Sequence, residues 1–276
     1  MKIRLASWNV NSLKVRLPQV FDWLERSGTD ALAIEETKMT DDAFPAEAFA
    51  ERGFWCRFAG QRTYNGVAVI GRRSRFAEPS AFISGIPGYP DDQKRFLALD
   101  LMPADASDAW SGAPIRFCCG YFPNGMAVGS SKYLYKLDWL AALSRTLRAM
   151  LAENPRLVIG GDYNIAPEDR DLWNPAAWAG QTPCSAPERE AFRRLLSLGL
   201  SDSFRLFEEP AESYSWWDYR QSGFEKNHGM RIDMLLVSEA LKPWVANAAI
   251  DAGPRANPQP SDHAPVLVDL EVPPEA

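Results

Sequence analysis

Short apolar runs alternate along the chain with longer segments in which apolar residues recur at helical spacing. The short runs predict buried strands, and the helical spacing predicts amphipathic helices. The expected strands are residues 4–11, 31–34, 66–70, 96–101, 115–120, 157–161, 232–237 and 266–270. The expected helices are residues 17–27, 133–153 and 187–199. Many strands with few, well-separated helices indicate an α/β fold in which two sheets pack together with helices outside.

No change in composition marks a linker in the 276 residues, and no low-complexity segment interrupts them. We therefore expect one domain over residues 1–272 and a short, frayed C-terminal tail over residues 273–276, with Val272 at their junction. No apolar stretch reaches the roughly 18 residues that a membrane helix needs. The first residues run directly into a strand pattern without the apolar segment of a signal peptide, which favours a cytoplasmic, bacterial-type protein.

The four cysteines, Cys56, Cys118, Cys119 and Cys184, show no CxxC spacing. Cys118 and Cys119 are adjacent in an expected strand, so their side chains should face opposite ways. We interpret all four as reduced core thiols. The net charge of −6 and pI of about 5.1 disfavour a broad basic face for nucleic acid. They allow a protein that concentrates carboxylates around a divalent cation, because the bound metal changes the local sign.

Polar side chains gather where the expected strands end or begin. Asp162 and Asn164 follow the run 157–161 two residues apart, so in an extended chain they point the same way. Taken alone, the pair fits equally a loop in which both side chains bond their own backbone. The same design recurs, and the full set is Asn9, Asn11, Glu36, Tyr121, Asn124, Asp162, Asn164, Asp233, Asp262 and His263.

This oxygen-rich set predicts a site for a hard divalent cation. Mg²⁺ takes carboxylate and carbonyl oxygens, and it usually keeps waters and substrate phosphate as further ligands. His263, one of only two histidines, lies beside Asp262, where an imidazole can orient or polarise a phosphoryl oxygen. A structural histidine is the alternative for His263. His228, between Asn227 and Gly229, is expected on a surface loop.

Eight short motifs, in order, give the chain a recognisable signature. They are WNVNSLKVRLPQV at 8–20, EETK at 35–38, YNGVAV at 64–69, GYFPNG at 120–125, GDYNIAPEDRD at 161–171, SWWDYR at 215–220, RID at 231–233 and SDHAPV at 261–266. Each motif alone is weak, but the set in this order and spacing is highly specific. The chain resembles the exonuclease III family of DNA-repair nucleases and apurinic/apyrimidinic (AP) endonucleases, from about residue 1 to residue 270.

The resemblance implies a four-layered α/β sandwich of two mixed sheets, as in DNase I-like proteins, and a metal-dependent phosphodiesterase. Mg²⁺ would be the cofactor, and Mn²⁺ would substitute for it. Glu36 would be the central metal ligand, with Asn9 and Asp262 nearby. Asp162 and Asn164 would complete the metal environment.

Catalytic roles carried over from the family fall on five residues. Asp162 would position or deprotonate the attacking water, and Asn164 would bond the scissile phosphate and orient Asp162. Tyr121 would contact the phosphate or the leaving oxygen, and Asp233 would hold His263 against a non-bridging oxygen. Together these groups supply what phosphodiester hydrolysis needs: an activated water, neutralised phosphoryl oxygens and a stabilised leaving alkoxide. Which group is the general base stays open.

The DNA contacts implied by the resemblance lie around this centre. Trp216 and Met230 would form an apolar pocket for a flipped sugar without a base, which is cheap to extrude because stacking is already lost. By alternation, Trp216 and Trp217 face opposite ways, and at least one is expected in the core. The other expected contacts to the DNA or its phosphates are Asn11, Lys38, Asn124, Arg220 and Arg231.

The departures from the family pattern are small. Glu35 stands where Gln is common, and alternation directs it away from Glu36. Gln259 stands where a Lys often precedes the SDHAP motif, and Met234 follows RID where His or Leu is frequent. The Gln259 change bears on DNA affinity and leaves the chemistry intact.

We expect a monomeric enzyme that acts on double-stranded DNA, cutting 5′ to abasic sites and trimming blocked or recessed 3′ ends. The alternative is a 3′-end-processing exonuclease and phosphatase with little AP endonuclease activity. A secreted DNase, inositol-phosphate phosphatase or sphingomyelinase of the same superfold is disfavoured by the SWWDYR segment. A non-catalytic relative is disfavoured because Glu36, Asp162, Asn164, Asp233 and His263 are all present.

Overall fold

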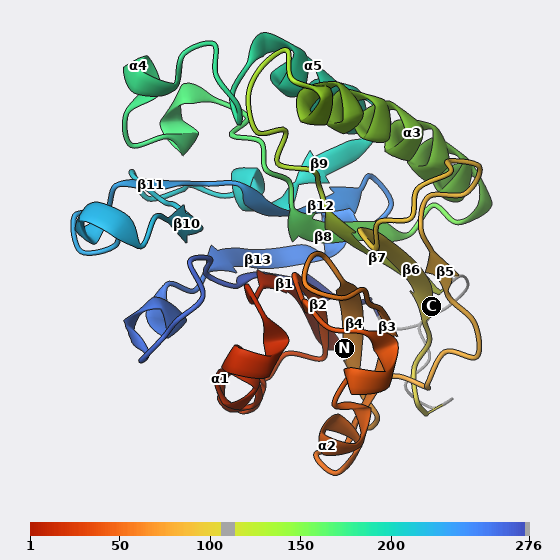
Figure 1. The fold of residues 1–276 in the computed structure, drawn as a ribbon. Coiled ribbons are helices and arrows are strands. Elements are labelled where there is room, and N and C mark those ends of the chain that lie inside the picture. Colours follow the sequence, from red (N-terminus) through yellow and green to blue (C-terminus); the bar gives the residue numbers. More distant parts are fainter. Residues whose placement is uncertain (106–113, 274–276) are drawn as a thin grey trace.

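A computed structural model describes residues 1–105 and 114–273 of the chain. Two six-stranded sheets face each other (Figure 1). The first contains, in spatial order, β13 (Val245–Ile250), β14 (Val266–Glu271), β1 (Lys2–Asn9), β2 (Ala31–Glu35), β4 (Val67–Arg72) and β3 (Phe54–Ala59). The second contains β5 (Ile83–Ser84), β6 (Phe96–Leu101), β7 (Ile115–Tyr121), β8 (Leu157–Asp162), β12 (Asp233–Ser238) and β9 (Leu200–Asp202).

Helices cover the outer face of each sheet, which makes four layers. Helices α1 (Leu13–Ser27) and α2 (Ala46–Ala50) pack on the first sheet, and α3 (Ser131–Glu153) and α5 (Ala186–Leu196) pack on the second (Figure 1). A separate apolar core fills the space between the sheets. The expected α/β sandwich is confirmed. Within the described ranges, no helix is both long enough and apolar enough to span a membrane.

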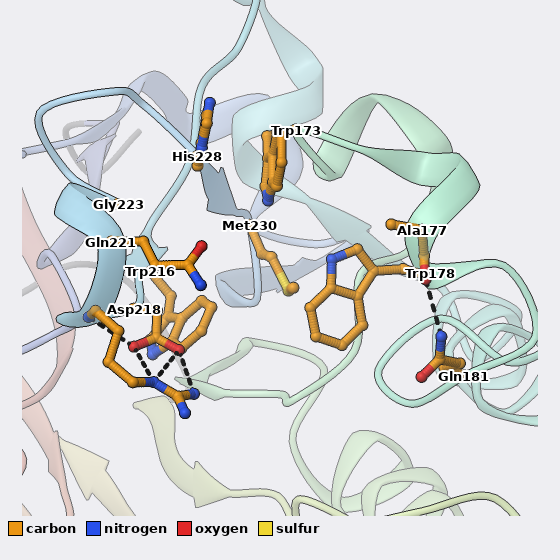
Figure 2. A pocket seen from close by; sticks show the side chains of 11 residues that line it. Trp173, Ala177, Trp178, Gln181, Trp216, Asp218, Gln221, Gly223, His228 and Met230 are labelled. Carbon is orange, nitrogen blue, oxygen red and sulfur yellow. Dashed lines mark hydrogen bonds and ion pairs between the residues drawn. The ribbon is translucent and has the colours of Figure 1, made fainter.

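Single helical turns connect many of these elements. The 3-10 turns are η1 (Asp41–Ala43), η3 (Asp169–Asp171), η4 (Ser203–Leu206), η5 (Arg220–Ser222), η6 (Lys242–Trp244) and η7 (Gly253–Ala256). Beside the open edge of the sheets lie the short helix α4 (Pro175–Trp178) and a two-stranded ribbon of β10 (Trp216–Trp217) and β11 (Gly229–Met230). Figure 2 shows that α4 and the ribbon bring Trp178, Trp216 and Met230 together.

The topology explains why polar strand ends meet. Strands β1 and β2 are parallel and joined through α1, and β7 and β8 are parallel and joined through α3. Their carboxyl ends therefore reach one edge, as in other α/β units. Strand β14 runs antiparallel to β1, and β12 runs antiparallel to β8, so both begin at this edge. The sequence segments around Asn9, Glu36, Asp162, Asp233 and His263 converge there.

Two glycines allow close packing below this edge, Gly161 between neighbouring strands of one sheet and Gly160 between the two sheets. A Cβ on Gly161 would lie 1.9 Å from the carbonyl oxygen of Gly120 in the neighbouring strand. A Cβ on Gly160 would lie 2.7 Å from Leu235 and 3.0 Å from the Cβ of Ser7, which belongs to the other sheet. The glycine pair that precedes Asp162 is therefore a packing requirement.

The differences from the sequence prediction lie mostly at edges. Strands β3 and β13 were not expected, because each is an outer strand of the first sheet without a long apolar run. Helix α1 starts at Leu13, earlier than expected, and it accommodates Pro18. The expectation that the chain frays from Val272 is wrong at that residue, because Val272 is buried and its N–H bonds to the Met1 carbonyl at 2.8 Å. Residues 274–276 lie outside the described ranges.

All four cysteines are free and buried, which confirms the expectation of core thiols. Cys118 packs in the core under α3, whereas Cys119 packs between the sheets. The opposite orientation of the adjacent pair follows from strand alternation.

Candidate active site

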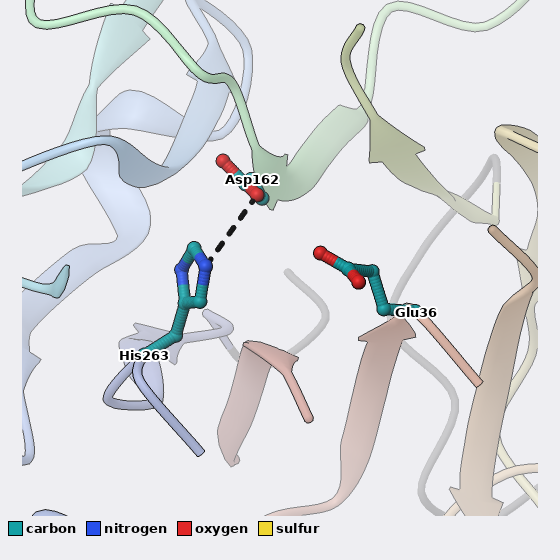
Figure 3. A group of neighbouring side chains, drawn as sticks. All are labelled: Glu36, Asp162 and His263. Atoms are coloured by element: carbon teal, nitrogen blue, oxygen red, sulfur yellow. Dashed lines mark ion pairs between the residues drawn. The ribbon is translucent and has the colours of Figure 1, made fainter. Parts of the chain in front are cut away.

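Three side chains from different strand ends form the centre of the site. Glu36 follows β2, Asp162 ends β8 and His263 precedes β14, and one ligand atom of each lies within 4.8 Å of the others. Figure 3 shows the three side chains pointing into a common space. Asp162 and His263 are buried, while Glu36 is partly open. Such a group of carboxylates with an imidazole fits a divalent cation and a phosphate.

Asn9 fixes the spacing of the two carboxylates. Its amide nitrogen donates to Glu36 Oε1 at 2.8 Å and to Asp162 Oδ2 at 3.0 Å. Its amide oxygen accepts the backbone N–H of Asn11 at 2.9 Å. Asn9 is fully buried at the end of β1, so it links the two sheets exactly at the level where the carboxylates meet.

Glu36 is held in its ionised form. Burial opposes ionisation, but the charge of Lys38 and the bond from Asn9 lower the pKa of Glu36 below its ordinary value of 4.5. Lys38 Nζ lies 2.8 Å from Glu36 Oε2 and also contacts the side-chain oxygen of Asn11. Glu36 and Lys38 both adopt left-handed backbone, with φ of 55° and 54°.

Asp162 is oriented by Asn164, as the sequence motif predicts. The backbone N–H of Asn164 donates to Asp162 Oδ1 at 2.9 Å, and its amide nitrogen donates to Asp162 Oδ2 at 3.1 Å. Asn164 reaches this position through a left-handed φ of 49°. Asn124 then donates to Asn164 Oδ1 at 3.1 Å, so Asn124 supports the site from β7's side of the cleft.

His263 and Asp162 form a coupled, buried pair. Asp233 holds His263 through Nδ1, which lies 3.0 Å from both carboxylate oxygens, and Nε2 lies 3.7 Å from Asp162 Oδ2. Burial lowers the pKa of His263, but the charges of Asp233 and Asp162 outweigh it and raise the pKa well above 6.5. Burial raises the pKa of Asp162 to about 7, against the opposing charge of His263. The His263–Asp162 pair therefore keeps a proton that can be shared with a phosphoryl oxygen.

Tyr121 lies across the site from His263, where it can act as a proton donor. Burial and the charges of Glu36 and Asp162 raise the pKa of Tyr121 well above 10, so the phenol stays protonated. The guanidinium of Arg95 lies 4.7 Å from the centre of its ring. This position agrees with a contact to the phosphate or to the leaving oxygen.

Asp262 joins the metal-ligand side of the site to its apolar side. Asp262 accepts from Asn11 at 2.9 Å and from the indole N–H of Trp216 at 3.0 Å. One cavity of about 380 Å³ is lined by Glu36, Asp162 and His263 together with Trp216 and Met230. The sequence predicted Trp216 and Met230 for the apolar wall, and the structure brings both to the cavity. Trp217 faces the other way and is buried.

A buried ion pair supports the site from behind, and it was not expected from the sequence. Lys136 of α3 is fully buried and pairs with buried Glu188 of α5. Lys136 Nζ donates to the carbonyl oxygen of Asn164 at 2.7 Å and to that of Asn124 at 3.3 Å. The signal was present, because Lys136 falls on the apolar stripe of α3, where a lysine needs a partner.

Arg231 does not lie where the family pattern suggests. Its side chain is 1% exposed and pairs with Asp171 at 2.7 Å and with Asp202 at 2.8 Å. This placement contradicts the expected DNA contact, and the charge serves instead to fasten β12 to its neighbours. Arg220 is 84% exposed in its side chain and pairs with Asp218, so it remains available to a phosphate.

Five further residues that line this cavity were not named from the sequence: Met126, Trp178, Thr182, Pro183 and Ile232. Trp178, Thr182 and Pro183 line the cavity from the loop between β8 and α5. Thr182 also donates to Glu188 at 2.6 Å, so this loop is tied to the buried ion pair. A loop without apolar periodicity gives no sequence signal for such contacts. Glu35, in contrast, behaves as expected: it turns away from Glu36 and is buried against Ser7 and Cys119.

The Endonuclease/Exonuclease/phosphatase family model matches residues 6–263. The chain belongs to the Endonuclease/Exonuclease/phosphatase family. It is 33% identical to exodeoxyribonuclease III of Haemophilus influenzae over 98% of this chain and 100% of that protein. The structure of the 3′ phosphatase NExo from Neisseria, bound to a product DNA hairpin, matches with a TM-score of 0.90 and 39% identity over 98% and 99% of the two chains.

An AP endonuclease structure from Archaeoglobus fulgidus also matches, with a TM-score of 0.87 and 30% identity over 98% and 100% of the two chains. The resemblance to exonuclease III-type enzymes is thereby confirmed, and the protein is a nuclease of the DNA-repair type within the Endonuclease/Exonuclease/phosphatase family. The family is metal-dependent, and the carboxylate cluster at Glu36 and Asp162 fits that requirement.

Proposed function

We propose that this protein uses Mg²⁺, or Mn²⁺ in its place, to hydrolyse phosphodiesters in double-stranded DNA, as a monomer. It incises 5′ to abasic sites and removes 3′ blocking groups or 3′-terminal nucleotides. The observation that carries the proposal is the cavity of about 380 Å³ in which the polar cluster and the apolar wall of Trp216 and Met230 meet. A phosphate at the cluster puts the adjoining sugar against that wall.

The chain's own residues account for each proton and charge. Glu36, with Asp162 and Asp262, would hold the metal, which supplies neutralisation of the phosphate charge when bound. Asp162 accepts a proton from the attacking water, and Asn164 keeps that carboxylate in place. The water oxygen bonds to phosphorus while the bond to the 3′ oxygen breaks. The leaving 3′ oxygen takes up a proton, for which the protonated Tyr121 phenol is the donor on the chain, and the products are a 3′-hydroxyl and a 5′-phosphate.

Two donors face the phosphate from opposite walls. His263, protonated and held by Asp233, donates to a non-bridging oxygen, where negative charge increases in the transition state. Tyr121 donates to the phosphate from the wall opposite His263. Asn11, Lys38, Asn124 and Arg220 act on the DNA strand or on the residues that hold it.

The apolar wall favours a sugar that carries no base. Trp216 and Met230 offer no free hydrogen-bond donor to a base edge, since the Trp216 N–H already donates to Asp262. An abasic nucleotide is extruded at low cost because it has lost its stacking and pairing. Selection of damage therefore comes from the ease of extrusion and from the fit to this wall.

A second candidate is a 3′-end processor with little AP endonuclease activity. Met126, Trp178 and Pro183 line the same cavity as the catalytic residues. A structure with 39% identity to this chain is described as a 3′ phosphatase. A 3′ terminus needs less room than a continuous strand, so bulky side chains in this cavity would favour ends.

Cleavage of three labelled duplexes separates these candidates. One carries a single internal abasic site, one carries a 3′-phosphate, and one is fully paired with a recessed 3′ end. With Mg²⁺, we expect rapid cutting at the abasic site and at the 3′-phosphate, and slower trimming of the paired end. Trimming without abasic incision selects the second candidate. A protein that cuts none of the three with Mg²⁺ or Mn²⁺ refutes both.

A further inference from the structure

A second cavity adjoins the cavity that holds the catalytic residues. It has a volume of about 540 Å³ and is lined by Trp173, Trp178, Trp216, Gln221, His228 and Met230, among others. We call it the aromatic pocket. Trp178, Trp216 and Met230 line both the aromatic pocket and the catalytic cleft. The two cavities are therefore neighbours that share these three lining residues.

The lining of the aromatic pocket suits a flat, aromatic ligand. Figure 2 shows Trp178 and Trp216 on opposite sides of Met230, with Trp173 and His228 above them in the view. Trp173 stacks on His228 with ring centres 3.8 Å apart and planes 9° from parallel. Trp173 is still 41% exposed, so one face of this stack stays open to a further ring. Stacking on aromatic faces is the sequence-tolerant way in which proteins hold nucleobases.

The polar groups of the pocket lie at its rim. Gln181 donates to the carbonyl oxygen of Ala177, which leaves its side-chain oxygen to accept. Arg220 and Asp218 form an ion pair at the surface of the pocket. Gln221 projects a carboxamide from the side opposite Gln181 (Figure 2). Carboxamides present both a donor and an acceptor, which suits the polar edge of a base.

An abasic sugar leaves this volume empty. In the proposed function, the sugar next to the reacting phosphate lies on Trp216 and Met230. A base attached to that sugar needs further space beside these residues, and the neighbouring cavity that they also line is the aromatic pocket. From this continuity we infer that the aromatic pocket binds the nucleobase of a 3′-terminal nucleotide while that nucleotide is removed.

This inference rests on the proposed function and assigns a binding site for the base to one of its reactions, the removal of 3′-terminal nucleotides. Nucleotides with unpaired or mismatched bases would enter most readily, because less stacking and pairing is lost on extrusion. The enzyme would then have two modes at one catalytic centre. Abasic incision would use the cleft alone, and nucleotide removal would use the cleft together with the aromatic pocket.

Two duplexes and three variants test the inference. One duplex ends in an unpaired 3′-terminal 2-aminopurine nucleotide, and the other carries an internal tetrahydrofuran abasic analogue. Trp173→Ala opens the stack, and Gln221→Ala removes a rim carboxamide without disturbing any aromatic contact. Phe82→Ala is the matched control, since Phe82 is 40% exposed, close to the exposure of Trp173, but lies at the β5 edge.

We expect Trp173→Ala to lower kcat/KM for removal of the 2-aminopurine nucleotide roughly ten-fold, within the range found for loss of one base–aromatic stack. Gln221→Ala should lower it about three-fold, as for one neutral hydrogen bond. Incision at the abasic analogue should stay within about two-fold for all variants, because that substrate has no base. Phe82→Ala should change neither reaction.

A binding measurement keeps the inference separate from the proposed function. In an Asp162→Asn background that does not turn over, binding should quench the 2-aminopurine fluorescence, and Trp173→Ala should restore most of it. Equal losses on both duplexes, or unchanged quenching, would overturn the aromatic pocket as a base site. Failure of the unmodified enzyme to cut either duplex would overturn the proposed function, while the quenching would still decide the question of the pocket.

Discussion

The two halves of the cleft are built differently. The catalytic half comes from the ends of long strands in two six-stranded sheets, and every carboxylate in it has several hydrogen-bond partners. The recognition half comes from the four-residue helix α4 and the two-residue strands β10 and β11. Its side chains, Trp178, Trp216 and Met230, meet mainly through apolar contacts.

This difference teaches where one fold can vary. Chemistry depends on atoms held to within fractions of an ångström, so it belongs on rigid elements. Recognition depends on the shape of loops, which tolerate substitution and insertion more readily. Family members can therefore keep one reaction and change the substrate. Substitutions in the catalytic half should abolish all reactions together, whereas those in the recognition half should separate the reactions from one another.

The largest effect is expected for Asp162→Asn. The amide cannot accept the proton of the attacking water, so kcat should fall by about 100- to 10⁴-fold on every substrate. Steady-state cleavage of the abasic and 3′-phosphate duplexes provides the measurement. Unchanged thermal unfolding and retained DNA binding in a gel-shift assay are the controls. More than a tenth of the original rate on either duplex would remove Asp162 from its assigned role.

The next largest effect is expected for Lys136→Met, and it is an effect on stability. It leaves Glu188 buried without its cation, so unfolding free energy should fall by about 3–5 kcal/mol. Urea unfolding measures this loss. The double variant Lys136→Met/Glu188→Gln is the matched control, because it removes both charges and should recover part of the stability. If the double variant is as unstable as the single one, packing and not charge explains the loss.

Met230→Ala tests the recognition half by itself, because it should weaken abasic incision and spare the chemistry. Removing this side chain from the apolar wall should lower kcat/KM for abasic incision by about 10- to 200-fold, the range for a lost apolar contact. Hydrolysis of a small diester such as bis(p-nitrophenyl) phosphate, which places no sugar on the wall, should stay within about two-fold. A parallel loss on the small diester would mean that the two halves do not act separately.

Glu35→Gln should give the smallest effect, on stability and not on activity. Burial raises the pKa of Glu35 well above 4.5 in the folded state, and one of its oxygens is buried without a partner. The folded state therefore binds a proton that the unfolded state has lost, so stability decreases as the pH rises above about 4.5 toward the folded pKa.

Glutamine carries no proton to lose in this window. The variant should melt about 2–4 °C higher than the original chain at pH 8, for a gain of about 1 kcal/mol, and the difference should shrink toward pH 5. Differential scanning calorimetry across this range is the measurement. A difference that grows toward low pH would mean that Glu35 is ionised in the folded protein.

The catalytic half was largely predictable from the sequence, and the recognition half only in part. Apolar runs that stop at Asn9, Glu36 and Asp162 mark central strands, and the recurrence of polar residues at their ends indicates one shared site. The aromatic neighbours of Trp216 had no such mark, because the loop that carries Trp178 follows no period. Arg231 was misjudged because a motif states which residue is present and not which way it faces.

The left-handed backbone at Glu36, Lys38 and Asn164 has a consequence for how the protein responds to selection. Each of these residues spends about 1–2 kcal/mol to hold a conformation that glycine adopts freely. Replacement by glycine relaxes the chain and removes the working side chain in one step. A selection for heat-resistant variants that does not also require DNA cleavage would therefore enrich substitutions at the residues on which cleavage depends. The most stable variants from such a selection would be inactive.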